Sequence, residues 1–274
     1  MQFLICNGTL VEAGAAAVKV TDHSYRYGDG LFETMKVVEG RIALAPLHFE
    51  RLWHGISELK LSLPAKISPQ LLENEIHELC RKNNCELAAR VRLSVSGGEG
   101  GLYDGDWQVR YVIECWPLTS TGNELNQQGL IIDVYPDARK SCDKFSNLKS
   151  ASHLPYAMAA RFAKDRNWDD CLLLNSFNRI CDSTIANIFW IKEGRVFTPP
   201  LAEGCIAGVM RKHLIEKLKP TRFAVQEKSC EIGDLESAKE IFLTNAIRGI
   251  RWVAKFRGRS VTNSIIRRII SGEM

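Results

Sequence analysis

Several features that mark specialised proteins are missing from this 274-residue sequence. No C-x-x-C pair occurs among its nine scattered cysteines, so we expect neither a zinc site nor a disulfide framework and predict no metal. No run approaches the ~18 apolar residues of a membrane span, and residues 1–8 lack the basic segment of a signal peptide. The net charge of +4 is too small and too evenly spread to indicate nucleic-acid binding. We therefore expect a cytoplasmic protein with reduced thiols and no membrane or nucleic-acid partner.

The composition itself is that of an ordinary globular protein. Hydrophobic residues make up 45% and charged residues 25%, with 20 Gly and 9 Pro, which excludes collagen-like and disordered classes. At ~100–200 residues per domain, the length predicts two lobes or one large α/β unit. Polar residues without periodicity fill 118–128. We therefore expect an N-terminal α/β domain over 1–117, a connector over 118–128 and a C-terminal domain over 129–274.

Strand-like and helix-like segments alternate along the chain, which predicts an α/β fold. Alternating or short apolar runs predict strands at 2–6, 34–38, 41–44, 90–96, 108–116, 130–134, 171–174, 186–191 and 240–244. Apolar residues at steps of three and four predict helices at 47–63, 69–83, 152–166 and 208–218. Glu39 and Gly40 form the expected hairpin turn, and Pro64 is the expected stop of the first helix.

Lys149 and Arg51 are the first candidates for a functional site. Lys149 lies in a polar hinge before the helix predicted at 152–166, where its amine can point into a cleft and form a Schiff base. Arg51 lies on the helix predicted at 47–63, and its guanidinium suits a phosphate. Each also has a simpler explanation, since Lys149 can be a surface lysine and Arg51 can be exposed or paired with Glu50.

Two turns offer groups suited to a phosphate. Gly208 precedes the last predicted helix, so the amides of Val209 and Met210 lie at the positive end of that helix. Thr244 and Asn245 end a predicted buried strand with a hydroxyl and a turn residue. Ordinary turns produce both patterns as well, so neither one establishes a site by itself.

Five motifs in a fixed order add weight to these candidates. They are Tyr-Gly-Asp-Gly-Leu-Phe-Glu-Thr at 27–34, His-Phe-Glu-Arg-Leu at 48–52, Lys149 before a helix, Cys-Asp-Ser-Thr-Ile-Ala-Asn-Ile-Phe at 181–189, and Gly-Val-Met-Arg at 208–211. In order and spacing the set resembles the class IV aminotransferases. That family comprises fold type IV pyridoxal phosphate enzymes, namely branched-chain aminotransferases, D-amino-acid transaminases and aminodeoxychorismate lyases. The resemblance extends over nearly the whole chain.

The resemblance implies a fold, a cofactor and a partner. The fold would have a small N-terminal α/β domain and a larger C-terminal α/β pseudo-barrel domain, with pyridoxal 5′-phosphate (PLP) between them. A homodimer would complete each site. Lys149 would carry the cofactor and act as general base and acid. The cofactor-binding residues that the resemblance implies are Arg51, Lys149, Asp182, Asn187, Val209, Met210, Thr244 and Asn245.

Two positions depart from the family pattern. The family has a glutamate opposite the pyridine nitrogen, and at that spacing this chain has Asp182, five residues before Asn187. Aspartate can keep the nitrogen protonated, but its side chain is one methylene shorter, so the ring sits closer or a water intervenes. Leu154 stands where the branched-chain enzymes have a tyrosine that binds the cofactor's O3′, and Tyr156 is the nearest substitute.

The substrate carboxylate needs a cationic partner that the family's usual motifs do not supply here. The Arg-x-His trap of the D-amino-acid transaminases is absent from 94–101, and Glu99 stands where the lyases have a loop arginine, although 244–250 resembles the lyases. The candidate replacements, each of which can also be an ordinary solvated or ion-paired arginine, are Arg26, Arg179 and the strand pair Arg90 and Arg92. We hypothesise that the first two replace the trap.

Three functions follow from these residues. The favoured one is a PLP-dependent aminotransferase that moves an amino group between an amino acid, D-enantiomers included, and a 2-oxo acid through a Lys149 Schiff base. The alternative is an aminodeoxychorismate lyase, which releases pyruvate and 4-aminobenzoate. A non-enzymatic phosphate-binding module is the third, and the catalytic spacing of Lys149 and Asp182 disfavours it.

Overall fold

The chain divides into two compact units in the computed structural model. The structure describes residues 1–15, 18–119 and 124–273. Unit 1 contains Met1–Gly122 and Leu148–Ser152, and unit 2 contains Asn123–Asn147 and His153–Met274. The division falls inside the connector expected at 118–128, of which residues 120–123 lie outside the described residues. The segment that carries Lys149 lies within the expected C-terminal range, yet it clusters with unit 1.

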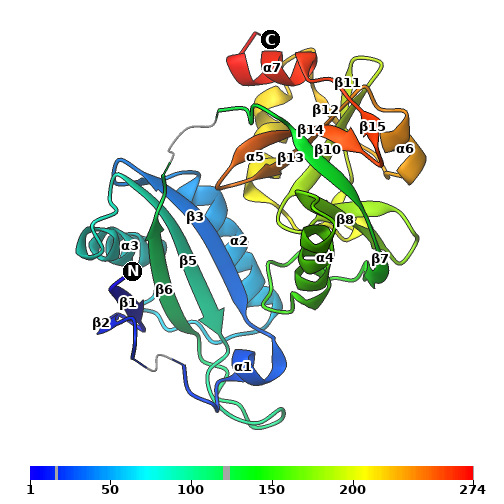
Figure 1. The fold of residues 1–274 in the computed structure, drawn as a ribbon. Coiled ribbons are helices and arrows are strands. Elements are labelled where there is room, and N and C mark those ends of the chain that lie inside the picture. The colour runs from blue at the N-terminus through cyan, green and yellow to red at the C-terminus, as the bar shows by residue number, and fades with distance from the viewer. Residues whose placement is uncertain (16–17, 120–123, 274) are drawn as a thin grey trace. The chain divides into compact units, whose positions relative to one another are not determined.

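Unit 1 is a six-stranded antiparallel sheet with helices on one face (Figure 1). Its strands are β1 (Phe3–Cys6), β2 (Thr9–Glu12), β3 (Leu31–Val38), β4 (Arg41–Ile42), β5 (Ala88–Ser96) and β6 (Arg110–Pro117). Its helices are α1 (His23–Tyr27), α2 (Ala45–Glu58) and α3 (Pro69–Lys82). The strand order is β2-β1-β6-β5-β3-β4. Helix α2 packs on β3, and α3 packs on β1 and β6.

Period-two alternation decides which face of this sheet the helices cover. On β3 the side chains of Leu31, Met35 and Val37 are buried in the core under the helices. Glu33 shares their face and is only 1% exposed, which makes it a charged residue in an apolar layer. Strands β3 and β4 join through Glu39 and Gly40. Both residues have positive φ (49° and 70°), as the sequence predicts for a tight hairpin.

The helix expected at 47–63 is shorter than predicted. Helix α2 ends at Glu58, and Lys60 adopts a left-handed conformation with φ 55°. This turn directs Leu61, 9% exposed, into the core of unit 1. The step-of-four pattern continued past the helix end because the later leucines pack from a loop. The other predicted strands and helices are present, with ends shifted by a few residues.

Unit 2 is built on a mixed sheet in the order β12-β11-β10-β13-β14-β7-β8-β9, with β15 beside β14 (Figure 1). Its strands are β7 (Leu130–Lys140), β8 (Asp170–Asn175), β9 (Ile180–Ser183), β10 (Asn187–Lys192), β11 (Arg195–Thr198), β12 (Val225–Glu227), β13 (Glu240–Asn245), β14 (Gly249–Phe256) and β15 (Arg259–Ser260). Its helices are α4 (Leu154–Asp165), η1 (Leu201–Glu203), α5 (Val209–Leu218), α6 (Ile232–Glu236) and α7 (Ser264–Ser271).

Helices cover parts of this sheet and bury strand β8 completely. Helix α4 packs on β7 and β8, and α5 and α7 pack on β13. All six residues of β8 are buried, as a continuous apolar run predicts for a strand covered on both faces. Among the described residues, no helix has the length and apolar content that crossing a bilayer requires.

Candidate active site

Lys149 lies beside β3 in unit 1. The Phe32 N–H donates to the Lys149 carbonyl at 2.9 Å, and the Ala151 N–H donates to the Gly30 carbonyl at 2.7 Å, so the segment runs along the start of the strand. The Lys149 ammonium lies 4.4 Å from the centroid of the Phe32 ring. The Arg92 guanidinium lies 3.9 Å from the same centroid. Phe32 therefore orients two cations, and Lys149 itself stays half-buried.

Arg51 is held by a buried carboxylate, that of Glu33. Its Nε and one terminal nitrogen donate to the two oxygens of Glu33 at 2.7 and 2.5 Å. His48 Nδ1 donates to Glu33 Oε2 at 2.6 Å. Burial alone would raise the pKa of Glu33, but the charge of Arg51 and the hydrogen bonds from His48 and Arg51 lower it to about 2. The guanidinium is thus fixed in one plane by a permanently ionised partner.

In unit 2, Asp182 is the centre of a buried polar network. Its Oδ2 accepts hydrogen bonds from the Ile206 N–H at 2.8 Å and from Tyr156 Oη at 2.9 Å, with Lys140 Nζ at 3.5 Å. Its Oδ1 accepts from Asn187 Nδ2 at 2.8 Å. Burial raises the pKa of Asp182 and the Lys140 charge only partly offsets it. Asp182 is therefore a carboxylate that binds a proton more readily than an exposed aspartate.

Asn187 connects this carboxylate to the start of α5. Besides its bond to Asp182, its Nδ2 donates to the Ile206 carbonyl at 2.8 Å. A Cβ at Gly208, the residue before α5, would lie 1.8 Å from Asn187 Oδ1, so only glycine allows this approach. Gly208 gives the helix no side-chain cap, which leaves the amides of Val209 and Met210 without intrahelical acceptors.

Thr244 completes the polar groups around this helix start. It pairs with Asn187 in the register of β10 and β13. Its hydroxyl is buried and makes no hydrogen bond to any residue that the structure describes. A buried hydroxyl without a partner and helix-start amides without intrahelical acceptors are groups that can bind an anion. The side-chain oxygen of Asn245 accepts hydrogen bonds from the N–H groups of Ile247 and Arg248 and so closes the turn after β13.

Of the four candidate substrate arginines, Arg92 lies over the Phe32 ring, as described above, and the other three lie in different surroundings. Arg26 donates to the Val20 and Gly100 carbonyls, both at 3.0 Å and both neutral acceptors. The Arg90 guanidinium lies 5.7 Å from the centroid of the Trp116 ring. Arg26 and Arg90 belong to unit 1.

Arg179, in unit 2, is ion-paired. Its Nε donates to Glu203 Oε2 at 2.6 Å, and Asn175 and Ser229 also donate to that carboxylate at 2.6 Å. Burial alone would raise the pKa of Glu203, but Arg179 and the two hydrogen bonds lower it, so the pair is ionised. An arginine already neutralised in this way attracts a substrate carboxylate less strongly.

Sequence reasoning missed two residues of these networks and gave no sign of the contacts of a third. Glu33 lies within a quoted motif, but nothing in the sequence pairs it with Arg51. Lys140 is the last residue of β7, six residues beyond the strand predicted at 130–134, and carries no local signal. Tyr156 was considered only for the cofactor's O3′, yet its hydroxyl bonds Asp182 and accepts a hydrogen bond from Lys140 at 2.5 Å. Leu154, at the family's tyrosine position, is 71% exposed.

Known proteins resemble this chain over almost its whole length. An aminodeoxychorismate lyase of Bacillus subtilis is 27% identical over 248 residues, 88% of this chain and 82% of that protein. A branched-chain-amino-acid aminotransferase of Pseudomonas aeruginosa is 24% identical over 263 residues, 93% of this chain and 85% of that protein. The crystal structure of a branched-chain aminotransferase from Thermoproteus uzoniensis with norvaline matches with a TM-score of 0.87 at 23% identity, covering 99% of this chain and 93% of that one.

The mixed α/β architecture is that of the fold type IV aminotransferases, as the structural match shows. The family model of the class IV amino-transferases matches residues 30–256, which is most of the chain. The chain therefore belongs to the class IV aminotransferase family, whose members use PLP. It is an aminotransferase or a lyase of that family, and the expected family and fold class are both confirmed.

Proposed function

We propose that this chain is a PLP-dependent aminotransferase that transfers an amino group between an amino acid and a 2-oxo acid, with Lys149 carrying the cofactor. The main support is Asn187, whose side chain links the Asp182 carboxylate to the start of α5 and which pairs with Thr244. Unit 2 thus offers a carboxylate for a ring nitrogen and an anion site for a phosphate. PLP has both a ring nitrogen and a phosphate, so the described residues fit this cofactor.

When bound, PLP supplies an aldehyde that condenses with amines and a ring that draws electrons from the substrate's α-carbon. Lys149 Nζ holds and moves the proton of that α-carbon as general base and acid. Asp182 binds the ring nitrogen and its proton, a role that its raised pKa allows. The amides of Val209 and Met210 and the Thr244 hydroxyl would bind the phosphate. The resemblance to the family assigns Arg51, which shares its charge with Glu33, to the same group.

For the substrate carboxylate, we place Arg26 and Arg90 ahead of Arg179. The contacts of Arg26 are to neutral carbonyls and that of Arg90 is to an aromatic ring, so both keep their charge for an anion. Arg179 shares its charge with Glu203. The D or L preference depends on which side of the cofactor this cation approaches, and both enantiomers belong in the assay.

The aminodeoxychorismate lyase is the second candidate, supported by the relative of that name at 27% identity. The surroundings of Glu99 favour the aminotransferase. Glu99 stands where the lyases have an arginine, and its carboxylate is neutralised by Lys19 at 2.9 Å and Arg110 at 3.5 Å. An anionic substrate therefore meets no free cation from this position. We also propose that the protein is a homodimer in the cytoplasm, as its family membership supports. Light scattering of the purified chain tests the homodimer.

The test is an absorbance scan of the purified protein before and after separate additions of D-alanine, D-glutamate, L-leucine and L-glutamate. We expect an absorbance band at about 420 nm, where PLP bound to a lysine absorbs. Addition of the true amino donor should shift this band to about 330 nm. A band that no amino acid shifts, with pyruvate released from aminodeoxychorismate, would establish the lyase instead. Absence of a visible band after incubation with PLP would contradict both.

A lysine substitution ties the band to Lys149. In Lys149→Ala we expect the 420 nm band to disappear and turnover to fall by about 10³-fold or more, because the anchor and the base are lost together. Lys164→Ala is the control, since Lys164 is an exposed lysine of α4. Equal loss in both variants would show that the effect is not specific to Lys149.

A further inference from the structure

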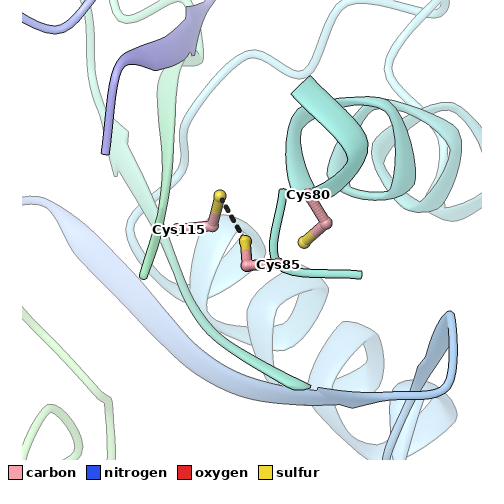
Figure 2. A group of neighbouring side chains, drawn as sticks. All are labelled: Cys80, Cys85 and Cys115. Carbon is pink, nitrogen blue, oxygen red and sulfur yellow. Dashed lines mark hydrogen bonds between the residues drawn. The ribbon is translucent and has the colours of Figure 1, made fainter. Parts of the chain in front are cut away.

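Three cysteine thiols of unit 1 meet in its core, away from the residues assigned above (Figure 2). Cys80 lies in the last turn of α3, Cys85 follows that helix, and Cys115 lies on β6. Their side chains are 1%, 4% and 0% exposed. The three sulfur atoms all lie within 4.8 Å of one another. Three soft ligand atoms are thus gathered in one dry place.

The end of α3 brings the first two thiols together. Asn84 adopts a left-handed conformation with φ 53°, and the Cys85 N–H donates to the Cys80 carbonyl at 2.9 Å. This turn folds Cys85 back beside the helix. Cys115, 30 residues further along the chain, lies with its sulfur 3.5 Å from that of Cys85. A spacing of four residues and a distant third cysteine form no recognised sequence motif, so sequence reasoning found no metal site here.

The sulfur positions suit a single central ion. Metal–sulfur bonds are about 2.3 Å long, which places three sulfurs around one ion roughly 3.8–4.0 Å apart. The Cys85 and Cys115 sulfurs are 3.5 Å apart, slightly less than that value, and all three sulfurs lie within 4.8 Å of one another. Rotation of the cysteine side chains by small angles is enough to close the difference. In Figure 2 the sulfurs of Cys85 and Cys115 point toward each other, and that of Cys80 lies on the same side of the helix end.

A fourth protein ligand is lacking among the residues that the structure describes. No histidine or carboxylate joins the cluster there. The nearest polar side chain is Asn83, whose Nδ2 donates to Cys115 Sγ at 3.2 Å. Its Oδ1 accepts from the N–H groups of Gln2 and Phe3 at 2.7 and 3.0 Å, so the amide oxygen faces away from the sulfurs. The donor set is three sulfurs.

We propose that Cys80, Cys85 and Cys115 bind one Cu⁺ ion through their three sulfur atoms. Cu⁺ is soft and prefers thiolates, whereas Zn²⁺ is almost always four-coordinate in closed structural sites. Each thiol that ligates the ion loses its proton to solvent, and no oxidation or reduction occurs.

The test is a titration of the full-length, reduced protein with Cu⁺ under anaerobic conditions, against a chromogenic chelator that competes for the ion. We expect the wild type to bind one more equivalent of Cu⁺ than the triple variant Cys80→Ala, Cys85→Ala, Cys115→Ala. The single variant Cys115→Ser should bind that equivalent at least about 10-fold more weakly. Cys171→Ala, at a buried cysteine of β8 in unit 2, is the control and should bind as the wild type does.

Each result decides the proposal. Equal Cu⁺ stoichiometry and affinity in the wild type and the triple variant would overturn the site. Zn²⁺ that binds as tightly as Cu⁺ and is lost in the same variants would overturn the choice of ion. If circular dichroism shows that the triple variant does not fold, X-ray absorption of the Cu⁺-loaded wild type tests the site instead. Three sulfurs at about 2.3 Å support the site and any other first coordination shell contradicts it. None of these readouts depends on the proposed enzymatic activity.

Discussion

Two fully buried carboxylates, one in each unit, have pKa values shifted in opposite directions. Glu33 on β3 has a pKa of about 2, below its ordinary 4.5. Asp182 on β9 has a raised pKa. Burial raises both, so the difference comes from the partners. Glu33 receives a two-pronged guanidinium at 2.5–2.7 Å and an imidazole. Asp182 has a single ammonium, 3.5 Å away, and neutral donors otherwise.

The comparison teaches that the distance of the cation decides in which direction the pKa of a buried carboxylate shifts, since both carboxylates are buried. A close bidentate cation makes Glu33 a permanent anion, whose task is to hold Arg51 in place. A more distant cation leaves Asp182 able to take or share a proton. Asp182 therefore suits a partner that itself brings a positive charge, such as the protonated ring nitrogen of the proposed cofactor.

The largest expected effect concerns the Glu33 pair. In Glu33→Gln we expect the free energy of unfolding to fall by about 3–5 kcal/mol, because Arg51 loses its partner in the core. Urea unfolding at neutral pH measures it. Glu50→Gln, at an exposed position of the same helix as Arg51, is the control and should change stability by less than about 0.5 kcal/mol.

The same pair predicts a pH dependence. Because the pKa of Glu33 is lowered from 4.5 to about 2, its stabilisation is fully present above pH 4.5 and is lost as the pH falls from 4.5 toward 2. Glu33→Gln should lack this part of the acid-induced loss. If the variant and the wild type lose stability in parallel over that range, the assigned role of Glu33 is wrong.

The second effect is on turnover. In Asp182→Asn we expect kcat to fall by about 100-fold, because an amide cannot keep a ring nitrogen protonated. The visible absorbance band should remain, since Lys149 and the anion site are untouched. Asp170→Asn is the matched control, because Asp170 is a buried aspartate of unit 2 whose pKa is also raised by burial and whose partner is Thr184. Full activity in Asp182→Asn would falsify the assignment.

The smallest effect sharpens the comparison most directly. Lys140→Met removes the ammonium whose charge lowers the pKa of Asp182, so this pKa should rise further. An enzyme that needs ionised Asp182 loses activity as the pH falls through this pKa. The acid limb of the kcat profile should therefore move to higher pH, by about one unit. Lys140→Arg should return it toward the wild-type position, and an unshifted limb in Lys140→Met speaks against the charge effect.

The predicted elements show which parts of the fold are local. Strands β5 and β6 and helix α3 follow from the periodicity of their own residues, and the structure confirms them. The helix predicted at 47–63 fails at its end because Leu61 packs into the core from a turn, which a local pattern does not reveal. Several unit 2 strands, β14 among them, were not predicted, since they are defined by pairing with distant neighbours.

The candidate site divides in the same way. Glycine before α5 is readable from the sequence, because helix starts have a local signature. The pairing of Arg51 with Glu33 is not readable from the sequence, because Glu33 lies 18 residues earlier in the chain. The sequence suggested the neighbouring Glu50 as a partner. The cysteine cluster is not readable from the sequence either, because Cys115 lies 30 residues after Cys85 in the chain.

By itself, the sequence determined the family, the helices and strands with strong periodicity, and the candidate lysine, because each depends on neighbouring residues or on ordered motifs. Only the tertiary structure decided which charges are paired. It joined Arg51 to Glu33, Arg179 to Glu203 and Lys140 to Asp182. Contact between side chains is set by strand register and by the packing of helices on sheets, and electrostatic energy depends on those distances rather than on positions along the chain.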